Sequence, residues 1–129
     1  ASVLGQAVPL HAGAVPKAIL AHLPEAEQER VLSRLASYPR FTDRTVVEPV
    51  RLREELAQIR QQGFSVSDGD YDLAARGVGA AIFDQSGKVV GGISVGGPVF
   101  RVDEAALARF SELIVQVARA VSRQLGYAG

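Results

Sequence analysis

The amino-acid sequence predicts an α+β domain in which helices flank a mostly antiparallel sheet. One observation is a pair of strand-like segments, 78–84 and 88–95, joined by the short glycine-containing connection Gln85-Ser86-Gly87, which makes them an antiparallel hairpin. The other is a long C-terminal segment that follows Asp103, a residue type that caps helices. Its apolar residues recur at helical spacing and form one stripe: Leu107, Phe110, Ile114, Val117, Val121 and Leu125.

Three further helices are expected before the hairpin. The first begins near Ala14, the second opens at Pro24, and the third runs from Glu48-Pro49 to about Gln62. A short strand at 64–66 and a polar loop at 67–70 then lead to the hairpin. This order of elements fits sensor domains of the GAF or PAS type better than a doubly wound fold.

The composition excludes several classes of function. The 129 residues suffice for one domain, and Lys+Arg and Asp+Glu both number 14, so the chain has no surplus of cations with which to hold nucleic acid by itself. With no cysteine, disulfides, thiolate zinc sites and cysteine nucleophiles are excluded. No apolar stretch approaches the roughly 20 residues that span a bilayer. We therefore expect a cytoplasmic protein without a membrane partner.

The sequence gives little support for a catalytic function. The usual general bases are limited to His11 and His22, which we expect to bond nearby backbone and to pack or face solvent, respectively. A hydrolase built from Ser94, His11 and Asp68 remains an alternative, but the sequence lacks a nucleophile elbow. The sequence predicts that the chain is not an enzyme.

Metal and cofactor sites are not expected either. Asp68, Asp70 and Asp72 alternate as in a calcium loop, but the positions that would need glycine and glutamate hold Leu73 and Gly79. We interpret the three acids as a solvated loop. The glycines make neither a dinucleotide fingerprint nor a P-loop, so no cofactor is predicted.

Small residues are concentrated on the two paired strands. Ala80 and Ala81 face the segment 91–96, which holds Gly91, Gly92 and Gly96. Gly91 and Gly92 indicate a bulge or a close approach of another backbone or a ligand. Two interpretations stay open: tight packing between layers, or a pocket for a small ligand beneath the helices.

Four ordered blocks resemble one family. They are Val8-Pro9-Leu10-His11-Ala12 with 17–25, then 45–64, then 67–84, and finally 91–98. Together they cover nearly the whole chain with matching spacing. The chain resembles the C-terminal effector-binding domain of the IclR family of bacterial transcription regulators.

The resemblance implies a GAF-like fold over residues 1–129 that binds a small-molecule effector, an organic acid or an aromatic metabolite. It implies homodimers or homotetramers that contact DNA only through an N-terminal winged helix-turn-helix, which this chain does not contain. The family's first sheet strands are also missing before Ala1, so the resemblance implies an N-terminally truncated domain.

The resemblance also implies a ligand site. Its residues are Ala14, Val15, Ser67 or Asp68, Gly77, Ser94 and Gly96. The backbone N–H groups at a helix start could hold a carboxylate, and the glycines would supply space. Pro16 replaces a family glycine, and Gly96 takes a place often held by serine, which favours a larger or more apolar ligand. The remaining alternative is an interaction module without a ligand, which would oligomerise through the last helix or an open sheet edge.

Overall fold

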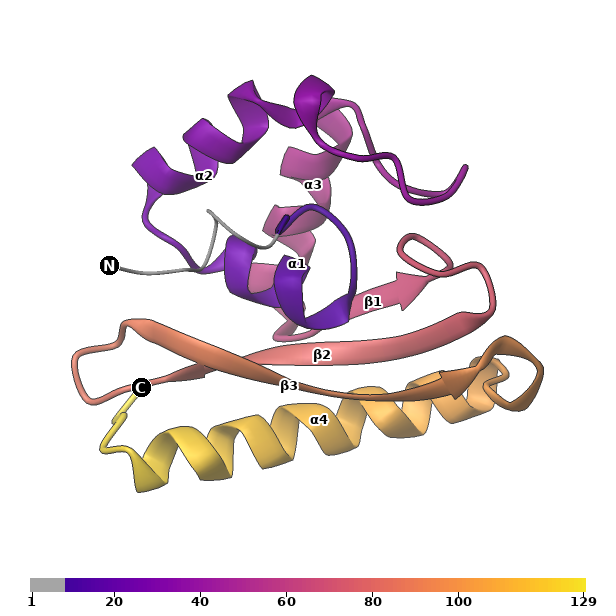
Figure 1. Ribbon diagram of the computed structural model, residues 1–129. Helices are drawn as coiled ribbons and strands as arrows, with labels where there is room; N and C mark the ends of the chain where they lie inside the picture. Colours follow the sequence, from indigo (N-terminus) through magenta and orange to yellow (C-terminus); the bar gives the residue numbers. More distant parts are fainter. Residues whose placement is uncertain (1–8) are drawn as a thin grey trace.

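A computed structural model describes residues 9–129, and Figure 1 shows a three-layer arrangement of helices, sheet and helix. Helices α1 (Ala14–Ala21), α2 (Glu25–Ser33) and α3 (Pro49–Gln62) lie on one face of the sheet, and α4 (Glu104–Gln124) lies along the other. The strands are β1 (Ser65–Asp68), β2 (Ala75–Phe83) and β3 (Val89–Pro98), in the order β1-β2-β3 with both pairs antiparallel. Short 3-10 helices η1 (Leu35–Ser37) and η2 (Val99–Arg101) follow α2 and β3. The predicted α+β class is confirmed.

The sheet register divides β2 into two unequal parts. Strand β1 pairs with β2 only from Asp68↔Arg76 to Ser65↔Gly79, whereas β3 pairs along the whole of β2. Beyond Gly79, no described strand lies beside β2 on the β1 side. At the hairpin end the register slips between Ile82 and Phe83, so that one extra residue of β3 makes a bulge next to Gly91. The bulge inferred from the glycine pair is confirmed.

Helix α4 packs on the sheet through small and branched residues. Asp103 accepts a hydrogen bond from Ala106 N at 2.8 Å, which confirms the predicted cap. Ile114 and Ala118 pack against Val78 and Ala80 of β2. The predicted stripe is wrong for its last positions, because the buried line continues through Ala118 and Ser122 while Val117 and Leu125 are exposed. The small side chain of Ala118 lets the helix approach the sheet closely, and Leu125 already lies past the end of α4.

Helix α1 approaches the opposite face just as closely. A Cβ at Gly79 would lie 2.7 Å from the carbonyl carbon of Ala14, and one at Gly92 would lie 3.0 Å from a methyl group of Val15. Above α1, leucines from α1, α2 and α3 form the main core, including Leu20, Leu32, Leu52 and Leu56. At this end of the sheet the small residues therefore serve close packing.

Three predicted strand boundaries need correction. Ser67 and Asp68 belong to strand β1 rather than to a loop, and β2 and β3 extend to Ala75 and Pro98, beyond the expected limits. Polar and glycine residues are poor strand formers locally, but pairing with a neighbouring strand supplies the hydrogen bonds that keep them extended. No helix within residues 9–129 is long and apolar enough to cross a membrane.

The close contact at Gly79 predicts a specific sensitivity. Gly79→Ala should destabilise the fold by about 1–3 kcal/mol, because the added methyl group meets backbone atoms of α1 that cannot turn away. Gly91→Ala is the matched control, since a Cβ there meets nothing within 4 Å. Urea unfolding followed by circular dichroism measures both, and equal stability of the two variants would contradict the packing described.

Candidate functional site

A groove of about 390 Å³ opens where α1 begins above the sheet. It is lined by residues from the start of α1, from strand β1, from the β1–β2 connection and from the paired ends of β2 and β3. They are Gly13, Ala14, Ser67, Tyr71, Asp72, Ala75, Arg76, Gly77, Val78 and 94–97. Its size is in the range of small-molecule sites.

The groove exists because no side chain fills the space next to the N-terminal end of α1. Gly77 and Gly96 are directly opposite each other in the register, and both line the groove. A Cβ on Gly96 would lie 2.5 Å from the carbonyl oxygen of Arg76, so the two strands approach too closely here for side chains. The result is a floor of bare backbone.

Five of the seven residues expected at a ligand site meet here: Ala14, Ser67, Gly77, Ser94 and Gly96. Val15 instead packs with Ile19 and Ala81 between α1 and the sheet. Asp68 lines a neighbouring polar cavity and pairs with Arg76 at 3.0 Å. The close-packing interpretation holds for Ala80, Ala81 and Gly92, which pack against the helices. At the opposite end of the hairpin, Gly77 and Gly96 line the groove, and a ligand there stays a prediction.

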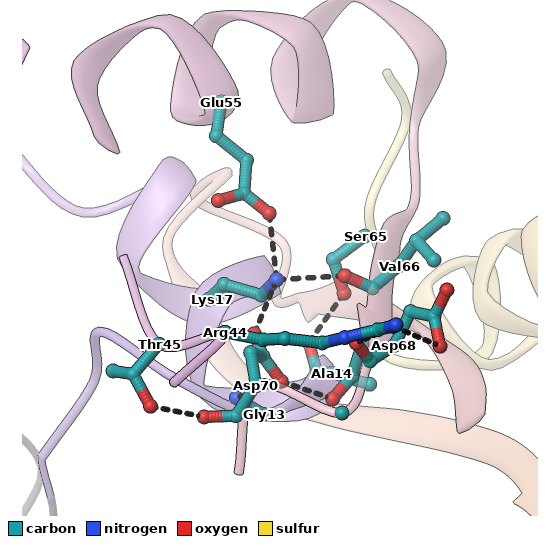
Figure 2. Close-up of polar contacts among 12 residues, drawn as sticks. Gly13, Ala14, Lys17, Arg44, Thr45, Glu55, Ser65, Val66, Asp68 and Asp70 are labelled. Carbon is teal, nitrogen blue, oxygen red and sulfur yellow. Dashed lines mark hydrogen bonds and ion pairs between the residues drawn. The ribbon is translucent and has the colours of Figure 1, made fainter. Parts of the chain in front are cut away.

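Beside the groove lies a buried ionic cluster around Lys17 (Figure 2). Lys17 is 2% exposed, and its Nζ lies 2.6 Å from Glu55 Oε2 of α3 and 2.7 Å from Asp70 Oδ2. The same ammonium group donates a hydrogen bond of 2.7 Å to the carbonyl of Val66 in β1. One charge thus connects α1, α3, β1 and the loop after β1.

Asp70 links this cluster to the groove. Its Oδ1 accepts hydrogen bonds from the Ser67 hydroxyl and from the N–H of Gly13, at 3.3 Å in the latter case, and both partners line the groove. Thr45 fixes the same loop by donating its hydroxyl to the Asp70 carbonyl at 2.6 Å. The interpretation of Asp70 as part of a solvated loop is wrong: the residue is 5% exposed. A buried ammonium group requires a buried counter-charge, and Asp70 supplies it.

The two histidines have separate environments. His11 is 1% exposed, stacks between Tyr38 and Phe41, and places Nε2 2.7 Å from the Pro39 carbonyl, as expected for a structural role. It does not line the groove that Ser94 lines, so the residues of the hydrolase alternative are not brought together. His22 packs edge-on against Phe83, and burial together with the nearby charge of Arg60 lowers its pKa below the ordinary value.

Comparison with known proteins decides the family. The family model described as the C-terminal domain of the bacterial transcriptional regulator IclR matches residues 1–123. The chain belongs to the IclR family, as its C-terminal domain. Its GAF-like fold is that of the family's solved C-terminal domains.

Individual relatives agree. The chain is 34% identical over 126 residues to the transcriptional repressor IclR of Escherichia coli, covering 98% of this chain and 45% of that protein. It is 37% identical over 113 residues to the regulator BhcR of Paracoccus denitrificans, covering 88% of this chain and 40% of that protein. The repressor BlcR of Agobacterium tumefaciens superposes with a TM-score of 0.84 at 31% identity, over 93% of this chain and 49% of that one. The chain thus spans about half the length of these regulators or less.

Sequence reasoning missed the ionic cluster and Tyr71. A signal for the first was present: Lys17 is the one charged residue within the otherwise apolar segment Ala14–Ala21, which predicts that it is buried and paired. Its partners Glu55 and Asp70 lie 38 and 53 residues away, where no local pattern connects them.

Removing the carboxylate of Asp70 should destabilise the fold. Asp70→Asn leaves the buried ammonium of Lys17 with one carboxylate partner, so we expect a loss of about 3 kcal/mol in the free energy of unfolding. Asp72→Asn is the control, because Asp72 is exposed and an asparagine oxygen can still accept the hydrogen bond from Ala74 N. Thermal and urea unfolding measure both. A loss below about 0.5 kcal/mol for Asp70→Asn would show that the pair is unimportant.

Proposed function

We propose that this IclR-family domain senses a small organic acid or aromatic metabolite in the groove at the start of α1, and that occupancy controls DNA binding by an N-terminal domain. The observation that supports this most directly is the convergence of Ala14, Ser67 and Ser94 around a floor formed by Gly77 and Gly96. The relatives are regulators, which supports binding rather than chemical turnover. Such a protein would act in the cytoplasm, where its DNA lies.

The chemistry of the groove suits a ligand with one polar end and a flat body. The first turn of a helix leaves backbone N–H groups without intrahelical partners, and Ala14 and Val15 carry such groups although Pro16 does not. A carboxylate placed there would be held by these N–H groups and by the positive end of α1. Hydroxyls of Ser67 and Ser94 would contact polar substituents, and the bare backbone of Gly77 and Gly96 admits a planar ring.

The ionic cluster offers a route from ligand to protein. A ligand that contacts Gly13 or Ser67 competes with their hydrogen bonds to Asp70. Because Asp70 also pairs with Lys17, and Lys17 with Glu55, a change at the groove would alter how α1 is held against α3. A ligand that favours a second arrangement of α1 over the one described here would thereby regulate the domain.

Filling the groove should abolish sensing. A panel of organic and aromatic acids should contain a compound that stabilises the wild-type chain, by about 2.7 kcal/mol at 100 times its Kd. Ser94→Phe should remove this stabilisation because its ring occupies the groove. Val90→Phe, on the same strand at an exposed position outside the groove, should retain it. Thermal unfolding with and without each compound measures the effect.

Two results would contradict the proposal. One is a well-folded wild-type chain that no compound of the panel stabilises. The other is a compound whose stabilisation persists undiminished in Ser94→Phe, which would place its site elsewhere.

A second role as an oligomerisation surface is favoured by one observation. Leu113 and Val117 of α4 are 50% and 39% exposed, on the flank of the helix about 100° around from the buried Ile114 and Ala118. Adjacent apolar residues on a helix surface are suited to contact with a second copy.

This surface predicts a change in association. Leu113→Lys should shift sedimentation toward the monomer, because a buried ammonium group opposes contact between copies. Gln116→Lys adds the same charge at an exposed position of the same helix and should have little effect. Equal sedimentation of wild type and Leu113→Lys across concentrations would exclude this surface as an interface.

A further inference from the structure

A third cavity, of about 670 Å³, lies at the end of β2 opposite to the groove. The polar side chains that matter for its chemistry come from α1, α3, α4 and the C-terminal tail: His22, Arg60, Arg119, Ser122, Arg123 and Tyr127. We call this cavity the basic notch.

The basic notch is a consequence of the short strand β1. Because β1 ends its pairing at Gly79, the edge of β2 from Ala80 to Phe83 has no strand beside it within the described residues. The N–H of Phe83 instead donates to the hydroxyl of Ser122 on α4, at 3.0 Å. Helices from the two outer layers thus approach the same bare edge and leave a hollow between them.

Its charge is one-sided. Arg60, Arg119 and Arg123 line the basic notch, and none of them forms an ion pair within residues 9–129. No Asp or Glu side chain lines it, so among the described residues its one negative group is the terminal carboxylate of Gly129. Residues 1–8 contain no acid that could neutralise it. The formal side-chain charges of the whole chain sum to zero, so three guanidinium groups around one cavity outnumber its single terminal carboxylate and are a local concentration of positive charge.

Two features hold these groups toward a common centre. Arg119 and Arg123 are one helical turn apart on α4 and therefore share a face. Arg60 lies across from them, where its Nη1 donates to the Ala21 carbonyl at 3.3 Å beside His22. The stacked rings of Phe83 and Tyr127 supply an apolar part of the lining of the basic notch.

We propose that the basic notch is a second ligand site, for a small oxyanion with two or more negative charges, carried by phosphate or by clustered carboxylate groups. Guanidinium groups bind both kinds of oxyanion through paired N–H donors. The volume suits a metabolite rather than a single ion. This site is independent of the effector groove, which lies at the other end of the sheet.

The test uses the two histidines as built-in reporters. His22 lines the basic notch, whereas His11 is buried under Tyr38 and Phe41. Proton NMR of the two imidazoles is followed during titration with pyrophosphate and, separately, with citrate, at constant ionic strength set with chloride. The His22 signal should shift saturably, and the pKa of His22 should rise because a bound anion favours the imidazolium form. The His11 signal should stay unchanged, and acetate should have no saturable effect.

Matched variants locate the site. Arg119→Ala combined with Arg123→Ala should weaken binding at least tenfold. Arg109→Ala removes one positive charge, half of what the double variant removes, from an exposed position nearer the start of α4 and should leave binding unchanged. A response to pyrophosphate alone assigns the site to phosphate groups, and a response to citrate alone assigns it to carboxylates. Absence of a saturable His22 shift with both probes, or equal weakening by Arg109→Ala, would overturn the proposal.

Discussion

The position of the groove at the start of α1 depends on the buried ammonium group of Lys17. Its contacts with Glu55, Asp70 and the Val66 carbonyl join a helix of one layer to a second helix, a strand and a loop. An ammonium group in the interior is tolerated only where such partners surround it, so the start of α1 is held at one place above the sheet. The groove is the space that this placement leaves uncovered. The contacts of Lys17 that fix the start of α1 are therefore the same contacts that the proposed sensing mechanism uses.

Local chemistry made the helices predictable and the strand ends less so. Asp103 at the cap of α4 and Gly63 at the end of α3, with a φ of 90°, mark boundaries through their own backbone preferences. Ser67 and Asp68 are extended because β2 pairs with them, and that pairing is not visible in a short window of sequence. Asp70 was misjudged for the same reason, since its burial is imposed by a lysine far away in the chain.

Glycine shows why the candidate site was only partly predictable. Gly77 and Gly79 are two residues apart on the same face of β2, and yet one lines the groove while the other contacts the backbone of Ala14. Their roles differ because α1 begins directly above Gly79 and not above Gly77. The family resemblance supplied the residues, five of which meet in the groove, but only the placement of α1 separates Val15 from them.

The hydrogen bond between the Phe83 N–H and Ser122 also bears on solubility during folding. A bare strand edge is a template on which another chain can add a strand, and continued addition leads to fibrous aggregates. Here a side chain already occupies one of the donors such an addition would need, and the flanking arginines would repel an identical copy approaching in the same orientation. The short strand β1 therefore leaves an edge that is guarded against self-templated growth.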